Sequence, residues 1–262
     1  MTKPLYDAIG QEYDSTRRPD PYLADRIHEL LEIEVGKHYL DLACGTGNYT
    51  NALRNMNASF VGLDNSQEML TSAHQKATKA AWILGTGEAL PFVKNGFPGA
   101  ICSLAIHHFK SLLPVFSEVY RVLEAGRFVI FTSTPEQMAG YWLNKYFPDT
   151  MRKSQLQMPS LESVAQYLGK AGFQNIETEQ YSVREDLVDL FLYSGKHRPS
   201  LYLNPQFRSG ISSFAALANQ EEVAIGCDLL AADIASRRIW NVIKDFENDK
   251  GDYLFIVAEK TG

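Results

Sequence analysis

The sequence predicts an α/β fold with a seven-stranded sheet, mostly parallel with an antiparallel last strand, helices on both faces, and a helical cap inserted before the last strand. Three observations predict this fold. Strand-length apolar segments alternate with segments of helical periodicity, the first strand runs into a glycine-rich turn, and about seventy residues separate the sixth strand from the seventh. Alternating strands and helices indicate a largely parallel sheet that is covered on both faces.

Most of the predicted strands are short apolar runs bounded by turn residues, as buried strands usually are. The strands are expected at residues 38–43, 59–64, 81–85, 99–104, 127–132, 173–181 and 253–259. The helices carry apolar residues at helical spacing and are expected at residues 21–33, 48–56 and 66–78, in a segment ending at 123, and at 160–171. Pro21 begins the first helix and Gly172 follows the last one, and both residues are typical of those positions.

The stretch from Ser182 to Asp252 interrupts this alternation. Connections in compact domains have a median length of roughly 4–6 residues, so a stretch this long is unusual. We therefore expect a core formed by residues 1–181 plus 252–262 and a helical cap at 182–251. Ligands bind at the carboxyl ends of the strands in such sheets, where the cap would cover them. The alternative is a helical appendage with no role at the site.

The composition is that of an ordinary globular protein, with 45% hydrophobic and 21% charged residues. The formal net charge is −6 and no basic stripe is present, which argues against nucleic-acid binding. No apolar run is long enough to span a bilayer, and the N-terminal residues lack the apolar core of a secretory signal. Cys44, Cys102 and Cys227 show neither paired nor metal-ligand spacing, so we expect a cytoplasmic location and no metal. The sequence does not indicate the oligomeric state.

The segment Asp41-Leu42-Ala43-Cys44-Gly45-Thr46-Gly47-Asn48 is the most informative one. It follows a buried strand and opens a helix, whose first N–H groups are free to bind a polar or negative ligand. Gly45 and Gly47 allow positive φ and let a ligand approach the backbone closely. The alternative is a tight turn with no ligand, because such glycine pairs are common.

Asp64 strengthens the ligand interpretation. It ends the next strand, seventeen positions after Gly47, where an acid in nucleotide-binding sheets accepts hydrogen bonds from ribose hydroxyls. An aspartate that only starts a turn or caps a helix is the alternative. The dinucleotide fingerprint requires a third glycine where Thr50 stands, so a pyrophosphate ligand fits less well. A ligand that carries a ribose is the favoured interpretation.

The segment DLACGTGNYT closely resembles the first motif of class I S-adenosylmethionine-dependent methyltransferases, which have a Rossmann-like fold. The match continues in VGLDNSQEML, GTGEALPF, ICSLAIHHF, EVYRVLEAGRFVI and YLGKAGFQNIE, and the opening YDAIGQEYDSTRRPD is similar to the helix that covers the cofactor in this family. The resemblance covers roughly residues 6–181 and 252–260. It is closest to the small-molecule, methyltransferase type 11 or UbiE-like group, and it implies S-adenosylmethionine as the cofactor.

The resemblance also implies roles for individual residues. Those expected to bind the cofactor face its methionine part, ribose or adenine, or belong to the N-terminal cover: Asp41, Gly45, Gly47, Asp64, Asn65, Met69, Gly87, Glu88, Ser103, Tyr13 and Arg17. Two positions depart from the family pattern. Thr86 stands where an acid usually meets the adenine amino group, and Pro98 with Gly99 stands where an acid usually begins the fourth strand. The adenine contacts are therefore less well defined than the ribose contact.

The implied reaction is transfer of the sulfonium methyl group to a small-molecule acceptor by in-line displacement, for which positioning supplies much of the rate. His107 and His108 follow the fourth strand, where a neutral imidazole could take a proton from the acceptor. Packing and helix capping are the alternative roles for these histidines. Likewise, Arg17 and Arg18 could bind an anionic acceptor or the cofactor carboxylate, or be solvated surface residues.

The cap contains aromatic residues that could line an acceptor pocket or could be plain core, namely Phe191, Tyr193, Phe214 and Trp240.

No asparagine–proline–proline–aromatic segment follows the fourth strand, which argues against methylation of nucleic acids or protein amides. A secondary metabolite or a quinone-like lipid is the expected acceptor. Two other functions remain open at this point, a NAD-dependent oxidoreductase and a non-catalytic regulatory protein that binds S-adenosylmethionine.

Overall fold

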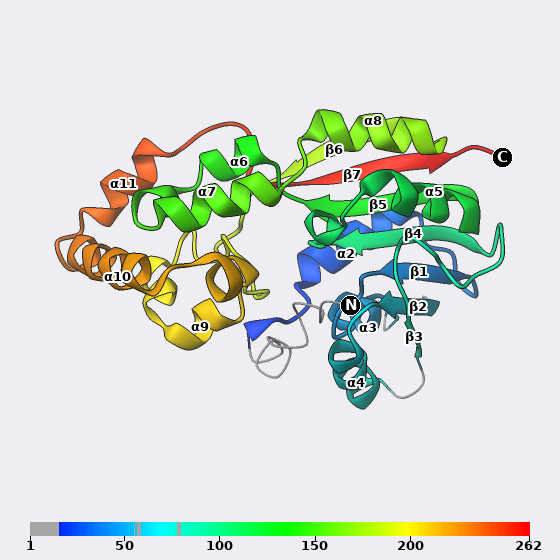
Figure 1. The fold of residues 1–262 in the computed structure, drawn as a ribbon, viewed down its shortest axis with the longest axis horizontal. Helices are drawn as coiled ribbons and strands as arrows, with labels where there is room; N and C mark the ends of the chain where they lie inside the picture. Colours follow the sequence, from blue (N-terminus) through cyan, green and yellow to red (C-terminus); the bar gives the residue numbers. More distant parts are fainter. Residues whose placement is uncertain (1–15, 55, 57–58, 78–79) are drawn as a thin grey trace.

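The computed structural model describes residues 16–54, 56, 59–77 and 80–262 (Figure 1). One sheet of seven strands lies at the centre of this part of the chain, in the order β3-β2-β1-β4-β5-β7-β6. The strands are β1 (His38–Leu42), β2 (Ser59–Asp64), β3 (Ala81–Leu84), β4 (Phe97–Ser103), β5 (Leu123–Thr132), β6 (Gln174–Tyr181) and β7 (Tyr253–Lys260). The predicted α/β fold is confirmed.

The strands are parallel except for β7, which pairs antiparallel with both β5 and β6. The chain order reverses beside β1, so that β2 and β4 lie on either side of it. In open sheets of this kind the crevice at the carboxyl ends of the strands is the usual ligand site. The last residues of β1, β2, β4 and β5 therefore mark the edge at which a site is expected.

Two strands begin earlier than the sequence pattern predicts. β4 begins at Phe97 rather than Gly99, and the register shifts at Pro98, where an irregularity accommodates a residue that cannot donate a ladder hydrogen bond. β5 begins at Leu123, because the preceding helix ends at Val122 and the chain continues at once as a strand. Both differences lie at the edge opposite the expected site.

Helices cover both faces of the sheet. On one face α2 (Pro21–Leu31) and α3 (Asn48–Arg54) pack on Tyr39, Ile101 and Val129. On the other face α5 (Leu112–Val122) and α8 (Leu161–Ala171) pack on the alternate residues of the same strands, such as Leu40, Ala100 and Phe128. This period of two is what a sheet buried on both sides requires.

Side-chain caps fix where several helices begin. Asp20 caps α2 by accepting a hydrogen bond from Leu23 N, and Ser66 caps α4 (Gln67–Lys76) in the same way. Ser160 caps α8, which ends at Gly172 with φ of 110°.

The three cysteines form no disulfide bond.

A second group of helices forms a lobe at one end of the sheet (Figure 1). The insertion contributes η3 (Pro199–Leu203), α9 (Pro205–Ser209), η4 (Ser213–Leu217), α10 (Gln220–Ala235) and α11 (Ile239–Asp245). The sequence assigned no element between residues 133 and 159, but the structure has α6 (Pro135–Ala139), η2 (Trp142–Lys145) and α7 (Pro148–Gln157) there, and η2 and α7 pack against the insertion. We call both segments together the helical lobe.

The helical lobe is tied together by contacts between its two segments. The carboxylate of Glu222, on α10, accepts hydrogen bonds from Asp149 N at 2.6 Å, from Thr150 N at 3.1 Å and from the Thr150 hydroxyl at 2.5 Å. It thereby caps α7, whose own N-cap residue makes no side-chain hydrogen bond. The rings of Tyr141 and Tyr193 stack with their centroids 3.8 Å apart.

The insertion leaves and rejoins the sheet at one point. Tyr181, the last residue of β6, pairs with Tyr253, the first residue of β7, and Asp252 N donates to Tyr181 O at 2.9 Å. The carboxylate of Asp252 accepts hydrogen bonds from Val183 N at 2.7 Å and from Lys196 Nζ at 2.8 Å.

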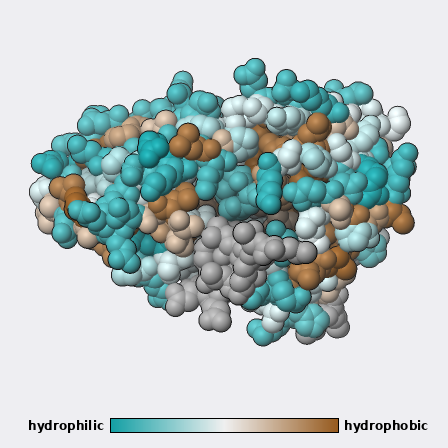
Figure 2. Space-filling model, in the orientation of Figure 1, coloured by the Kyte–Doolittle hydropathy of each residue, from teal (hydrophilic) through white to brown (hydrophobic). Residues whose placement is uncertain are grey.

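On the face shown in Figure 2, hydrophilic residues predominate and apolar residues lie in separate patches.

Candidate functional site

The glycine-rich turn joins β1 to α3 at the carboxyl edge of the sheet. Ala43, Gly45 and Gly47 have φ of 56°, 55° and 72°, in the left-handed region that favours glycine. A Cβ on Gly45 would meet no atom within 4 Å, whereas one on Gly47 would lie 2.2 Å from the Trp82 ring. Gly45 thus leaves the backbone open to a ligand, and Gly47 is required by packing as well as by its conformation.

Asp64 ties the end of β2 to this turn. One carboxylate oxygen accepts from Gly45 N at 2.8 Å, and the other accepts from Ser66 N at 2.9 Å. The side chain is mostly buried. Each carboxylate oxygen has two acceptor sites, and these two bonds fix the orientation of the group at the end of β2.

Asp41 lies one strand away, on β1, and is buried. The Thr50 hydroxyl donates to its carboxylate at 2.5 Å. The pKa of Asp41 is raised from 3.8 to about 7, mainly because burial removes water from the carboxylate, and also because Asp64 is negatively charged. A cation bound beside it would favour the ionised form.

Gly45 and Asp41 border a hollow of about 450 Å³, part of it open to solvent, whereas Gly47 and Asp64 lie beside its lining and not in it. We call it the turn hollow. Its lining consists of Arg17, Asp41, Ala43, Cys44, Gly45, Thr46, Asn48, Tyr49, Ser103 and Asp189. Four of the residues predicted to bind a cofactor, Arg17, Asp41, Gly45 and Ser103, are therefore brought together at one place.

The residues predicted to flank an adenine lie farther along the same edge and line neither hollow described here. Asn65 and Glu88 are exposed, and Met69 is buried in the first turn of α4. Gly87 is buried, and a Cβ there would meet Val115 and Phe109 at 3.1 and 3.2 Å. Tyr13 lies outside the described residues. The roles of these residues remain predictions.

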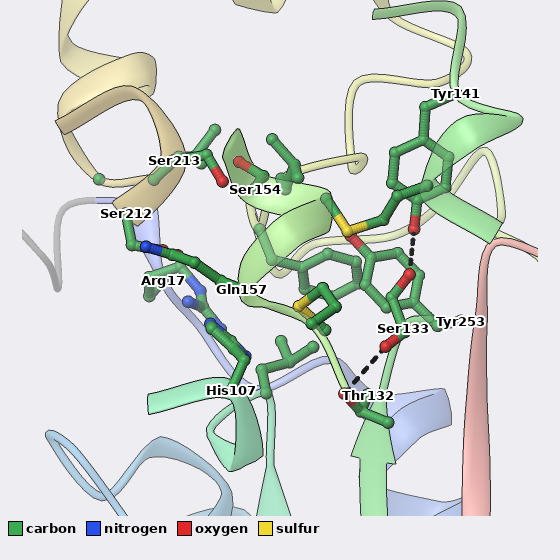
Figure 3. A pocket seen from close by; sticks show the side chains of 17 residues that line it. Arg17, His107, Thr132, Ser133, Tyr141, Ser154, Gln157, Ser212, Ser213 and Tyr253 are labelled. Carbon is green, nitrogen blue, oxygen red and sulfur yellow. Dashed lines mark hydrogen bonds between the residues drawn. The ribbon is translucent and has the colours of Figure 1, made fainter. Parts of the chain in front are cut away.

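A second hollow, of about 660 Å³ and also partly open, lies between the sheet edge and the helical lobe (Figure 3). We call it the lobe hollow. It is lined by Arg17, Leu104, His107, Thr132, Ser133, Met138, Tyr141, Ser154, Gln157, Met158, Phe191, Leu192, Gly210, Ile211, Ser212, Ser213 and Tyr253. Leu104 and Thr132 stand at the carboxyl ends of β4 and β5, so this hollow adjoins the expected site. Most of these residues had no role assigned from the sequence.

Arg17 lines both hollows. Its guanidinium forms a two-pronged ion pair with Asp189, with Nε to Oδ1 at 2.6 Å and Nη2 to Oδ2 at 3.1 Å. The Tyr49 hydroxyl donates to the same carboxylate at 3.1 Å. Asn48 Nδ2 donates to the carbonyl of Arg17 at 3.1 Å. The wall shared by the hollows is thus a hydrogen-bonded unit made from the segment that precedes α2, the start of α3 and the insertion.

The two histidines are placed differently. His107 lines the lobe hollow, and its Nδ1 is buried with no hydrogen-bond partner among the described residues. Burial, with a smaller contribution from His108, lowers the pKa of His107 well below 6.5, so the ring is neutral at pH 7. The ring of His108 lies 3.9 Å from that of His107, is more exposed, and does not line the hollow.

The four aromatic residues of the insertion also separate. Phe191 lines the lobe hollow, whereas Tyr193 and Phe214 are buried but do not line it. Trp240 is 54% exposed, so it is neither pocket wall nor core.

Within residues 16–54, 56, 59–77 and 80–262, no cluster of three metal-ligating side chains and no helix able to cross a bilayer is found.

Comparisons with known proteins identify the family. The methyltransferase domain family matches residues 40–131, from β1 to β5. A solved structure from Anabaena variabilis, described as a methyltransferase from an antibiotic biosynthesis pathway, is 32% identical, with a TM-score of 0.84 over 93% of this chain and 98% of that one.

Two curated relatives show the same relationship. A demethylmenaquinone methyltransferase from Lactococcus lactis is 25% identical over 68% of this chain and 83% of that protein. The biotin biosynthesis bifunctional protein BioHC from Teredinibacter turnerae is 31% identical over 65% of this chain, and the match spans only 33% of that larger protein.

The turn hollow and its border fit an adenosyl cofactor, because Gly45 leaves the backbone open, Asp41 lies in the lining, and Asp64 is held beside Gly45. The nicotinamide-dependent oxidoreductase considered above is therefore set aside. The chain belongs to the class I S-adenosylmethionine-dependent methyltransferases, and S-adenosylmethionine is its cofactor.

Proposed function

We propose that the chain methylates a small molecule that binds in the lobe hollow. The observation that carries this proposal is that the two hollows adjoin each other at the carboxyl edge of β4. Ser103 lines the turn hollow, the next residue, Leu104, lines the lobe hollow, and Arg17 lines both. An acceptor in the lobe hollow would therefore lie beside the methionine end of the cofactor.

The cofactor supplies a methyl group already activated by its sulfonium. The work left for the chain is to orient the two substrates and to exclude water, and good alignment alone contributes about 7–11 kcal/mol in favourable cases. We assign cofactor binding to Asp41, Gly45, Asp64 and Ser103. Phe191 and the lobe helices would hold the acceptor against the sheet edge.

We further propose that His107, rather than His108, faces the reacting group of the acceptor. Its neutral ring and unpartnered Nδ1 suit a group that takes a proton or a hydrogen bond from an acceptor hydroxyl. Replacing a general base typically slows turnover by about 10²–10⁴-fold. His107→Ala should therefore lower kcat by such a factor, whereas His108→Ala should change it little. Equal effects of the two changes would refute this assignment.

The acceptor we propose is a metabolite with a ring or lipid character, of quinone or secondary metabolism. The named relatives act in quinone and biotin biosynthesis or are ascribed to antibiotic biosynthesis, which supports a small molecule over a polymer. The net charge of −6 supports the same choice. The unpaired cysteines support a reducing, cytoplasmic location.

The test is production of S-adenosylhomocysteine from S-adenosylmethionine in the presence of a fractionated small-molecule extract. Phe191→Leu should raise the KM for the active fraction several-fold and leave the Kd for the cofactor nearly unchanged. Trp240→Ala is the matched control, because this exposed residue of the same insertion lines neither hollow. Equal effects of the two variants, or no turnover with any fraction, would count against the proposal.

A further inference from the structure

Two residues that line the same hollow each carry a buried polar atom without a hydrogen-bond partner among the described residues. Among the described residues, the buried side-chain atoms that make no hydrogen bond are Asn51 Oδ1, His107 Nδ1, Ser154 Oγ, Tyr181 OH and Ser194 Oγ. Two of them, His107 Nδ1 and Ser154 Oγ, belong to residues that line the lobe hollow. Buried polar groups are nearly always hydrogen-bonded, because leaving one unpaired costs about 1–3 kcal/mol. A ligand in the hollow would supply the missing partners.

Ser154 is the less expected of the two. It lies in the interior of α7 and is only 4% exposed. A serine inside a helix ordinarily donates back to the carbonyl four residues earlier, here that of Thr150, and Ser154 makes no such bond. Figure 3 shows it on the side of the hollow formed by the helical lobe, while His107 comes from the sheet edge.

The position of Ser154 is fixed by bonds on both sides of it. Glu222 caps the start of α7, Lys153 Nζ donates to Leu217 O at 3.2 Å, and Gln155 Nε2 donates to Asn144 Oδ1 at 2.9 Å. These bonds join α7 to α10, to η4 and to η2. A side chain held this firmly can fix the orientation of a ligand.

Among the described residues, the lining of the lobe hollow carries no net charge. Arg17 is the one arginine or lysine of this described lining, and the two-pronged bond to Asp189 neutralises it. No carboxylate of the described part of the chain lines the space, and His107 is neutral. A charged ligand would be buried there without a free counter-charge, which is strongly unfavourable. The remaining lining consists of hydroxyl, amide, thioether, aromatic and aliphatic groups.

We infer that Ser154 is a specificity-determining residue, whose hydroxyl binds an uncharged polar group of the acceptor at the lobe side while His107 faces a second polar group at the sheet side. The acceptor is then a neutral molecule with an apolar body and hydroxyl or carbonyl groups at two ends. This inference rests on the proposed function, since it takes the occupant of the lobe hollow to be the methyl acceptor.

The experiment measures binding rather than turnover, in the presence of saturating S-adenosylhomocysteine. Naphthalene-2,6-diol is the neutral probe and 6-hydroxy-2-naphthoate the anionic one, and both are followed by their own fluorescence at pH 7. The diol should bind saturably and the naphthoate at least tenfold more weakly. Ser154→Ala should weaken binding of the diol by about five- to tenfold, which corresponds to one neutral hydrogen bond.

Ser194→Ala is the matched control. Ser194 is buried and its hydroxyl is also unpartnered among the described residues, but it does not line the hollow. This variant should bind the diol as the wild type does. Both alanine variants should keep or slightly raise the Tm, because each removes an unsatisfied group. A marked fall in the Tm of Ser154→Ala would mean that the hydroxyl serves the fold and would overturn the inference.

Three further results would overturn it. They are failure of the wild-type chain to bind the diol, tighter binding of the naphthoate than of the diol, and equal affinity of Ser154→Ala and Ser194→Ala for the diol. The proposed function fails by a different result, the absence of S-adenosylhomocysteine formation with every extract fraction. An enzyme that turns over an extract component but binds the naphthoate more tightly would retain the proposed function and refute the inference.

Discussion

Single residues at the end of β2 and in the turn after β1 have a structural role besides the cofactor-binding role predicted for them. Asp64 accepts hydrogen bonds from the backbone of the turn after β1 and of the loop after β2, so its carboxylate is oriented in the ligand-free chain. Gly47 makes room for Trp82. The sequence indicates these residues as cofactor-binding candidates because their chemical types and spacing are characteristic, but the contacts of Asp64 with the backbone and of Gly47 with Trp82 required the structure.

Changing Asp64 to Asn should weaken cofactor binding about ten- to hundredfold. The substitution keeps the size of the side chain but replaces a charged acceptor by a neutral one, and hydrogen bonds to charged groups contribute about 1.5–3 kcal/mol. Isothermal titration with S-adenosylhomocysteine gives the Kd. Asp25→Asn, at an exposed position of α2, is the control. An unchanged Kd in Asp64→Asn would show that the ribose lies elsewhere.

Asp41 should make the ligand-free protein less stable as the pH rises. Its pKa is about 7 in the folded chain, compared with about 3.9 in an unfolded one. Between these values the folded chain holds a proton that the unfolded chain has released. The contribution to stability is therefore fully present below about pH 4 and is lost by about pH 7, at up to about 1.4 kcal/mol per pH unit.

Urea unfolding of the wild type and of Asp41→Asn at pH 5, 6, 7 and 8 measures this dependence. The amide cannot ionise, so the difference in unfolding free energy between the two proteins should shift in favour of the variant as the pH rises to 7. A difference that is constant from pH 5 to 8 would mean that the buried carboxyl has an ordinary pKa.

At the scale of elements, the lobe hollow depends on a helix that the sequence pattern did not indicate. α7 has the sequence PDTMRKSQLQ, and its buried residues are Thr150, Met151 and Ser154. Because two of these three are polar, the buried face produces no apolar periodicity. Most of the strands were predictable because they bury apolar runs, whereas the edge strand β6 (QNIETEQY) buries only its last residue. The insertion was predictable as a helical region, but its partner α7 and the role of Ser154 required the tertiary structure.

The cap on α7 should be important for the helical lobe. Glu222→Ala removes the acceptor for two backbone N–H groups and the Thr150 hydroxyl, so we expect a loss of about 1–2 kcal/mol in unfolding free energy. Urea denaturation measures it. Glu221→Ala, at the exposed neighbouring position, should change stability by less than about 0.5 kcal/mol. Similar losses in the two variants would show that the cap contributes nothing specific.

At the scale of the whole molecule, one continuous apolar cluster joins the α2 face of the sheet to the helical lobe. It runs from Leu23 and Ile27 through Phe131 and Phe255 to Leu230 in α10. The lobe is therefore part of the core packing and not a loosely attached appendage. The division into a core of residues 1–181 plus 252–262 and a cap at 182–251 stays a prediction, which the packing of residues 135–157 against the insertion would modify.

Cofactor binding should stabilise this whole unit. S-adenosylmethionine or S-adenosylhomocysteine at a hundred times its Kd should add about 2.7 kcal/mol to the unfolding free energy, and NADH should add nothing. A thermal-shift series over ligand concentration measures both effects. A Tm raised by NADH and unchanged by S-adenosylhomocysteine would contradict the assigned cofactor.

The meeting of Tyr181 and Tyr253 in one antiparallel pair makes the chain between them a very long hairpin loop. The entropy of closing a flexible loop grows slowly with its length, by only about 0.6 kcal/mol for each doubling. The β6–β7 ladder would therefore tolerate replacement of residues 183–251 by a segment of different length, provided that the new segment buries the apolar surface now covered. Such an exchange would alter the helical side of the lobe hollow and leave the glycine turn and Asp64 in place. It would also replace Asp189, which binds Arg17 and Tyr49 and lines the turn hollow. A new segment inserted at this single junction must therefore carry an equivalent acid if the wall shared by the two hollows is to persist.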